Sequence, residues 1–227
     1  MAVITARQSA DEMAALERQL SETERDPTAH VGALRAALAH PCSQHGFSQP
    51  ELWSELARAL GGLGDYDGAV EAIEAGVEHG AWAQPHPRAD VAEWHLLAGR
   101  RDQAEATYAT LREQSPRNVW LYNHAGLAYA DVGDHTTAVR WLTEGLQVAL
   151  ADGASERLVS QLATLRSQSM TELGADPDDE LTRAAMAGPT VPAAPRSTPP
   201  QPALSAPCGH CGYDPGAGFT STSLPVR

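Results

Sequence analysis

The chain of 227 residues contains no lysine, and its 16 basic residues are all arginines. Aromatic residues make up only 5% of the sequence, so a hydrophobic core must be built mainly from alanine, leucine and valine. Alanine is the best helix former and a poor strand former, which favours closely packed helices over a sheet. The lack of lysine beside abundant alanine and glycine is typical of a GC-rich bacterial genome, and we assign it no binding role.

Positive charge is scarce. The net charge is -13, and residues 188–227 contain two arginines and one aspartate, so residues 1–187 carry -14. Nucleic-acid binding depends on neutralising phosphates with arginine and lysine, and an anionic membrane attracts the same side chains. We therefore expect neither nucleic acid nor a membrane as a partner. The charge is typical of a solvated acidic surface that keeps a protein in solution.

Disulfides and long hydrophobic runs are also missing. Three cysteines, an odd number, do not form a secreted disulfide framework. No apolar stretch approaches the ~20 residues of a membrane-spanning helix, and the N-terminal residues lack the apolar run of a signal peptide. These features predict a cytoplasmic protein with reduced thiols.

An internal repeat organises the middle of the chain. Three segments align on a glycine followed five residues later by an alanine, and the successive glycines of these segments are 35 and 34 residues apart. The three pairs are Gly64 and Ala69, Gly99 and Ala104, and Gly133 and Ala138. Apolar residues at 3–4 spacing lie on both sides of each pair, which predicts two antiparallel helices joined by a short turn. The glycine would end the first helix, and the alanine would lie where the two helices cross.

A period of about 34 residues resembles that of the tetratricopeptide-repeat (TPR) family. The resemblance covers about residues 50–150, and it implies three repeats over 50–83, 85–118 and 119–152. The first repeat carries Trp53, Leu56, Ala57, Gly64, Tyr66 and Ala69; the second carries Ala92, Gly99, Ala104, Tyr108 and Pro116; the third carries Tyr122, Gly126, Tyr129, Gly133, Ala138 and Leu142. The second repeat departs from the pattern at Arg88 and His95, and its first helix should be short.

The flanking segments extend the helical prediction. Residues 1–49 read as a degenerate helical pair, with helices over 7–24 and 28–39, and residues 154–187 read as capping helices. The last short helix is expected to start at Asp176 and Pro177. From residue 188 the composition turns to proline, alanine and serine, which predicts a disordered linker and tail. The predicted fold class is therefore all-α, a TPR-like α-solenoid with a disordered C-terminal tail.

The resemblance implies a binding groove lined by the first helix of each repeat. The residues expected to face it include Glu51, Ser54, Arg58, His86, Ala89, Glu93, Trp120, Asn123 and Leu127. Of these, Asn123 could pair with a peptide backbone, Arg58 with a carboxylate and Trp120 with an apolar side chain. The basic pair by which chaperone-binding relatives grip a C-terminal carboxylate is not evident. The expected function is a scaffold or adaptor that binds a peptide or helix of a protein partner.

No constellation in the sequence indicates catalysis. There is no HExxH, no glycine-rich phosphate loop and no GxSxG, and nothing orients a base beside Cys42. We therefore predict that the protein is not an enzyme and requires no cofactor.

One motif supports an alternative. The tail sequence CGHC places Cys208 and Cys211 two residues apart, as in half of a zinc site, but a second pair of ligands is missing from the tail. His40, Cys42 and His45 could supply it only if the tail folded back or two chains paired. The alternative hypothesis is a metal- or redox-responsive TPR module. Zinc binding is not the favoured interpretation.

Zinc content tests this half-site. Because tetrahedral zinc needs four ligands and the tail offers only part of the set, we expect the chain purified under reducing conditions to hold no stoichiometric zinc. The measurement is metal content by mass spectrometry of the parent and of a Cys208→Ser, Cys211→Ser variant. One zinc per parent chain and none in the variant would contradict the prediction.

Overall fold

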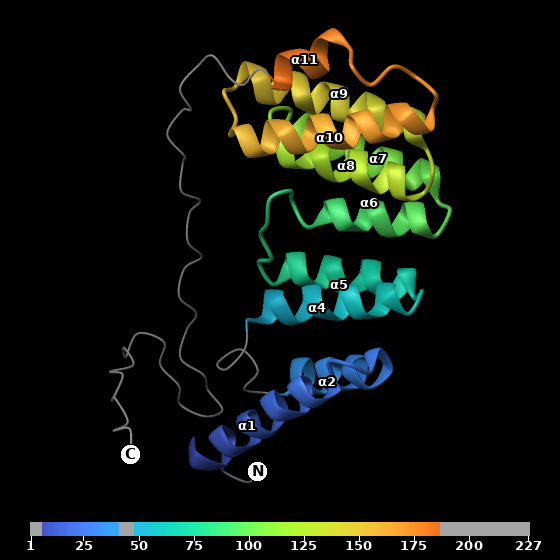
Figure 1. Cartoon of the computed structure of the whole chain (residues 1–227). Coiled ribbons are helices and arrows are strands. Elements are labelled where there is room, and N and C mark those ends of the chain that lie inside the picture. The colour runs from blue at the N-terminus through green and yellow to red at the C-terminus, as the bar shows by residue number, and fades with distance from the viewer. Residues whose placement is uncertain (1–5, 41–47, 187–227) are drawn as a thin grey trace.

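The computed structural model describes residues 6–40 and 48–186, and these residues form helices and no strand (Figure 1). The helices are α1 (Ala6–Thr23), α2 (Pro27–Ala39), α4 (Gln49–Gly62), α5 (Tyr66–Glu78), α6 (Arg88–Leu97), α7 (Arg101–Gln114), α8 (Val119–Asp131), α9 (His135–Ala151), α10 (Glu156–Glu172) and α11 (Glu180–Met186). The predicted all-α class is confirmed. The predicted linker and tail over 188–227 lie outside the described residues.

Consecutive helices pack as antiparallel pairs, and the pairs stack in chain order from α1 at one end to α11 at the other (Figure 1). In most steps the second helix of a pair packs on the first helix of the next, as α5 does on α6 and α9 on α10. The first helices α6 and α8 also contact each other directly. The first helices thus share one side of the stack, which positions the surface considered below.

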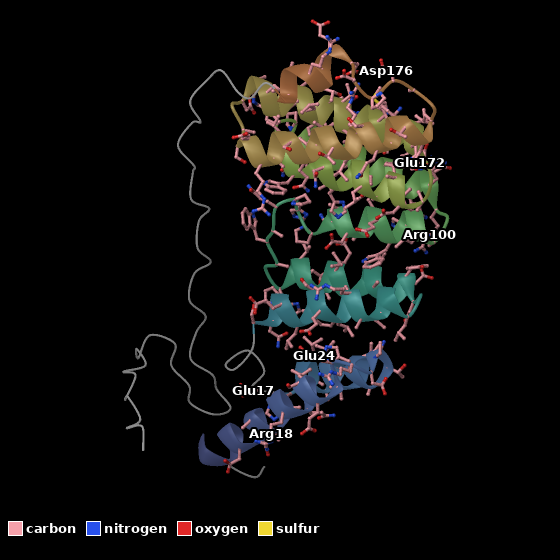
Figure 2. All side chains as sticks on the ribbon, in the orientation of Figure 1. Glu17, Arg18, Glu24, Arg100, Glu172 and Asp176 are labelled. Carbon is pink, nitrogen blue, oxygen red and sulfur yellow. The ribbon has the colours of Figure 1, made fainter. Side chains whose placement is uncertain are left out.

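The three repeat turns share one hydrogen-bonding pattern. Gly64, Gly99 and Gly133 have φ angles of +80°, +73° and +79°, a region that side chains other than glycine rarely adopt. In each turn the amide after the glycine donates to a carbonyl five residues back, at 2.8–3.0 Å, which closes the end of the first helix. The residues Asp65 and Asp134 then cap the next helix with their carboxylates. The second repeat has Arg100 instead, which is labelled in Figure 2. The Arg100 guanidinium pairs with Asp67.

Small residues let the two helices of a pair approach closely. A β-carbon added at Gly126 of α8 would lie 2.3 Å from Cγ of Leu142 in α9. A β-carbon added at Gly145 of α9 would lie 2.5 Å from Cβ of Tyr122 in α8. Real β-carbon contacts are essentially never this short, so an alanine at either position would displace the facing side chain, Leu142 or Tyr122.

The second repeat places its large apolar side chain on the second helix of the pair, whereas the first repeat places it on the first helix. In the first repeat the aromatic Trp53 packs against Gly76, where an added β-carbon would lie 3.1 Å from Cβ of Trp53. The equivalent positions of the second repeat hold Arg88 and Leu111. Arg88 turns outward and pairs with Glu74 of α5 at 2.8 Å, whereas Leu111 is buried. In the second repeat the apolar side chain of Leu111 in α7 therefore replaces the one that Arg88 in α6 does not provide. As expected, α6 is short, because it begins only after Pro87.

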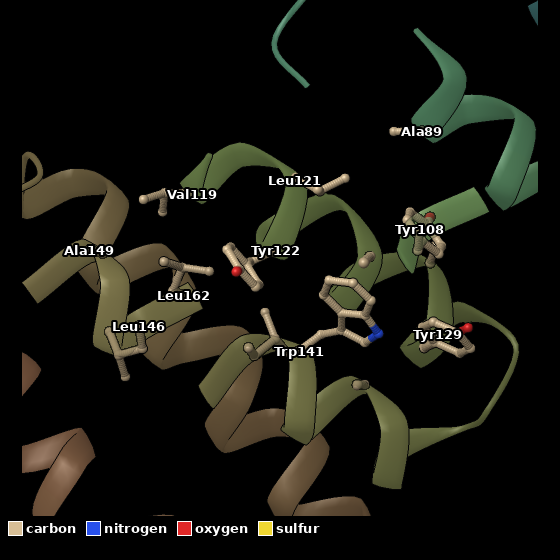
Figure 3. Close-up of a cluster of buried hydrophobic side chains, with 14 of the residues drawn as sticks. Ala89, Tyr108, Val119, Leu121, Tyr122, Tyr129, Trp141, Leu146, Ala149 and Leu162 are labelled. Atoms are coloured by element: carbon tan, nitrogen blue, oxygen red, sulfur yellow. The ribbon is translucent and has the colours of Figure 1, made fainter. Parts of the chain in front are cut away.

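The buried side chains form two clusters that adjoin at α6. One cluster joins α2, α4 and α5 and includes Val91 of α6. The other joins α6 to α11 and includes Ala89 and Ala92, so opposite sides of α6 serve different clusters. Tyr108 and Trp141 stand close together in the second cluster, with ring centroids 5.6 Å apart (Figure 3). The aromatic side chains that are buried among the described residues, Tyr108, Tyr122, Tyr129 and Trp141, all belong to this second cluster.

The C-terminal helix begins later than the sequence predicted. The expected start at Asp176 and Pro177 is wrong, because α11 begins at Glu180 and Asp179 caps it by accepting a hydrogen bond from the Thr182 amide at 2.9 Å. The buried Arg166 of α10 binds the same carboxylate. This ion pair, together with the hydrogen bonds from Thr182, holds the pKa of Asp179 well below its usual range. The contact between Arg166 of α10 and Asp179 therefore determines that Asp179 is the residue that caps α11.

Replacing Gly126 with alanine tests the close α8–α9 approach. We expect Gly126→Ala to lower the free energy of unfolding by about 1–3 kcal/mol, because the added methyl group must displace Leu142. The matched control is Gly32→Ala in α2, where no atom lies within 4 Å of the added carbon. That change should instead stabilise the protein by about 0.5–1 kcal/mol through helix propensity. Urea denaturation measures both, and equal effects would contradict the close-packing argument.

Candidate functional site

The first helices α4, α6 and α8 form a surface that we call the groove face. A hollow of about 470 Å³ between α4 and α6 is lined by Glu51, Glu55, Arg58, Trp82 and Asp90, among others. Direct contact of α6 with α8 continues the surface to the third repeat. The residues of the groove face are Glu51, Glu55, Arg58, Trp82, Asp90, Glu93, Trp120, His124, Leu127 and Asp131.

A histidine on α8 joins two carboxylates on α6. The His124 Nε2 atom lies 3.1 Å from Oδ1 of Asp90 and 3.2 Å from Oε2 of Glu93. Asp90 and Glu93 are three residues apart and so share one side of α6. His124 comes 34 residues after Asp90, one repeat period, so the two occupy equivalent positions on neighbouring first helices. The repeat spacing itself therefore places the imidazole against the carboxylates.

The carboxylates keep His124 protonated. Burial by itself lowers the pKa of this histidine, but the hydrogen bonds to Asp90 and Glu93 outweigh it and raise the pKa to about 9. At neutral pH the ring is therefore an imidazolium that donates from Nε2 to the carboxylates. Its other nitrogen, Nδ1, lies 3.1 Å from the hydroxyl of Tyr108, whose own pKa is raised by burial so that the phenol stays neutral. The cluster as a whole carries one negative charge.

This cluster also resembles a set of metal ligands. Asp90, Glu93 and His124 each offer one ligand atom, and these atoms lie within 4.8 Å of one another. A metal ion would have to displace the proton on Nε2, because a histidine ligand binds in its neutral form. The two carboxylates already hold that proton, so the cluster is satisfied as an ion pair between α6 and α8.

Exposed apolar side chains flank the ion pair. Trp120 and Leu127 are each 41% exposed, and they lie four residues before and three residues after His124 on α8. This spacing places all three on one side of the helix. Trp82, in the segment between α5 and α6, is 60% exposed and lines the hollow beside α4. Large apolar side chains thus border the acidic cluster on two sides.

Carboxylates outnumber cations across the groove face. Glu55 of α4 lies 3.0 Å from the buried His30 of α2, and Glu51 lines the same hollow as Arg58. At the far end, burial and the nearby charge of Glu93 raise the pKa of Asp131. The charge of Glu93 thus adds to the burial that already disfavours the ionised form of Asp131.

The structure separates the residues predicted for the groove. Arg58, Trp120 and Leu127 are exposed, and Glu93 is half-buried in the ion pair. Asn123 is only 8% exposed, and its Oδ1 is buried without a hydrogen-bond partner among the described residues. A contact of Asn123 with a peptide backbone would therefore have to use the nitrogen atom of its side-chain amide, Nδ2. Ala89 was expected to face the groove but is fully buried, because this side of α6 packs into the core.

Sequence reasoning missed the most organised feature of the groove face. Asp90, His124 and Trp82 were not among the residues expected to face the groove. The available signal was the spacing of one repeat period between Asp90 and His124, which puts opposite charges on adjacent first helices. Trp82 carried no signal, since it lies outside the helical pattern.

The candidate zinc ligands are only partly described. Cys42, Cys208 and Cys211 lie outside the described residues, so their metal binding stays a prediction. His40 lies at the C-terminal end of α2, and its Nε2 is 3.2 Å from Oε2 of Glu12 in α1. Within residues 6–40 and 48–186, no helix is long and apolar enough to cross a lipid bilayer.

Comparison with known proteins gives few matches. No family model matches the sequence, and no curated protein matches it. Among solved structures, the chain is similar to the crystal structure of BtubC (BKLC) from P. vanneervenii. The similarity covers 86% of this chain and 98% of that chain, with 18% sequence identity and a TM-score of 0.46. Similarity at this level does not indicate a function.

The His124 ion pair predicts a specific pH dependence of stability. The pKa is raised from 6.5 to about 9 in the folded state, so its contribution is complete below pH 6.5 and is lost as the pH rises through about 9. We expect the free energy of unfolding to fall by about 1–3 kcal/mol over this range. His124→Gln should remove most of this fall, because glutamine carries no charge for Asp90 and Glu93 to hold.

Urea denaturation of the parent and of His124→Gln at about pH 6 and about pH 9.5 measures the difference, since any ionisation of tyrosine near pH 10 acts on both proteins. His86 and His95 provide an internal check. Their pKa values are lowered, chiefly by burial, so their effects appear as the pH falls below 6.5 and not above it. The same loss of stability in parent and variant would contradict the assignment.

Proposed function

We propose that this chain is a non-enzymatic repeat protein of the tetratricopeptide type, and that its groove face binds a peptide or helix of a protein partner. The observation that carries the proposal is the exposure of Trp120 and Leu127 beside the fixed ion pair of α6 and α8. Helical repeat stacks commonly present such surfaces to extended or helical segments.

The exposed side chains stand on a rigid support. Two other residues of α8, Tyr122 and Tyr129, are buried against the neighbouring helices. The same helix therefore anchors its aromatic residues on one side and presents Trp120 on the other. A rigid aromatic side chain loses little conformational freedom on binding, and tryptophan is enriched among the residues that dominate binding energy. These properties suit Trp120 as the anchor point for a partner.

The alternative is a module in which Cys208 and Cys211 respond to metal or oxidation. It depends on residues beyond the described range and is decided by the zinc measurement given above. No contact among residues 6–40 and 48–186 favours it, whereas the groove face is formed entirely from described residues.

Removing the two apolar side chains tests the proposal. We expect the variant Trp120→Ala, Leu127→Ala to capture at least tenfold less of the partner than the parent, because a buried tryptophan anchor typically contributes about 2 kcal/mol or more. The measurement is quantitative co-purification with the full chain from cells in which the protein is native. Circular dichroism and urea denaturation establish that the variant remains folded.

The matched control removes apolar surface elsewhere. Leu63 and Leu173 are 47% and 48% exposed and follow the last residues of α4 and α10. The variant Leu63→Ala, Leu173→Ala should capture the partner as the parent does. If both double variants lose capture equally, or if neither does, the groove face is not the binding surface.

A further inference from the structure

We propose that the segment bound by the groove face is positively charged and amphipathic, with arginine or lysine side chains opposite Glu51 and Glu93 and apolar side chains against Trp120 and Leu127. This inference rests on the proposed function and adds the chemical class of the partner. It follows from three features: unpaired carboxylates, an ion pair with residual negative charge, and the spacing of the apolar side chains.

The carboxylates near α4 are available to a ligand. Glu51 is exposed at the edge of the hollow, and no cation contacts it among the described residues. Glu55 shares that hollow and contacts His30 with only one of its oxygens. Arg58 is the one arginine lining this hollow. A cationic side chain entering between α4 and α6 would therefore meet more negative charge than positive.

The cluster on α6 and α8 is not neutralised internally. His124 supplies one positive charge to the two carboxylates of Asp90 and Glu93, which remain 47% and 34% exposed at their side chains. Asp131 adds a further exposed carboxylate at the last residue of α8. A guanidinium or ammonium group placed beside these carboxylates would gain charge-assisted hydrogen bonds.

The apolar contacts set the spacing of the ligand. Trp120 and Leu127 are seven residues apart, or roughly 10 Å along α8 at 1.5 Å per residue. That distance corresponds to two helical turns, so an apolar stripe on a partner helix could contact both while its basic side chains reach the carboxylates between them. An uncharged apolar helix would leave those carboxylates partly desolvated without a partner, which costs free energy.

The charge of the whole protein favours the same class of partner. The net charge of -13 repels acidic segments at long range and attracts basic ones. Charge complementarity of this kind raises the association rate, whereas Trp120 and Leu127 would slow dissociation once they are buried.

Three synthetic peptides of about 18 residues, five turns of helix, test the inference with the full chain. The first has lysine on one face and leucine on the other, the second replaces every lysine with glutamate, and the third replaces every leucine with serine. Fluorescence anisotropy of labelled peptides at about 20 and about 200 mM salt measures affinity. We expect the lysine–leucine peptide to bind at least tenfold more tightly than either of the others, and to weaken at higher salt.

Two charge variants show whether binding is local to the groove face. Glu51→Gln, Glu93→Gln should weaken binding of the lysine–leucine peptide about three- to tenfold, while the glutamine at position 93 can still accept a hydrogen bond from His124. Glu113→Gln, Glu172→Gln makes the same change in net charge at exposed positions of α7 and α10 and should leave the affinity unchanged. If both variants lost the same amount of affinity, the peptide would be held only by the net negative charge of the protein and not by the groove face, which would overturn the inference.

The outcomes separate this inference from the proposed function. Tighter binding of the glutamate–leucine peptide, or no dependence on charge, would overturn the basic partner class. If capture of the native partner still depended on Trp120 and Leu127, the proposed function would survive that result. If the lysine–leucine peptide bound but Trp120→Ala, Leu127→Ala had no effect on its affinity, both proposals would fail at the groove face.

Discussion

The close approach of the two helices in each pair is the constraint on which the rest of the structure depends. Gly126 and Gly145 lie against Leu142 and Tyr122 of the paired helix, and a β-carbon at either glycine would clash with those side chains. Ala57 and Ala92, both buried, occupy the position of Gly126 in the first two repeats, so a small side chain recurs there. Only because α6 and α8 are in direct contact can His124 reach Asp90, one repeat period earlier in the chain. Close packing of neighbouring helices therefore underlies the arrangement of the groove face.

The ion pair of His124 has two roles that follow from one geometry. It joins α6 to α8 at a step where α7, the second helix of the preceding pair, touches α8 only slightly. The imidazolium also neutralises only one of the two negative charges of Asp90 and Glu93. The ion pair that stabilises the stack therefore leaves a net charge of -1 on the groove face. The buried phenol oxygen of Tyr108 accepts a hydrogen bond from Nδ1 of the protonated His124, and this second contact fixes the plane of the imidazole ring. The stability of the α6–α8 contact and the negative charge of the groove face therefore both depend on Asp90, Glu93 and His124.

Features with a local cause could be predicted from the sequence, and features that depend on contacts between distant segments could not. The turns after α4, α6 and α8 follow from the glycine period, and the all-α class follows from alanine content and helical spacing. The start of α11 was mispredicted because Arg166, on another helix, determines which aspartate serves as the cap. Likewise, the burial of Ala89 and the exposure of Trp82 depend on how α6 sits between two clusters, which no local pattern reveals.

A surface that exposes Trp82, Trp120 and Leu127 invites association with a second copy of the same chain. The carboxylates around them oppose it, because two groove faces brought together would place Glu51, Glu93 and Asp131 of one copy near the same residues of the other. Such repulsion costs free energy that apolar contact alone must overcome. A basic segment meets no such opposition and gains attraction from the same groups. The combination of apolar exposure and negative charge thus disfavours self-association while it leaves the surface open to a partner of opposite charge.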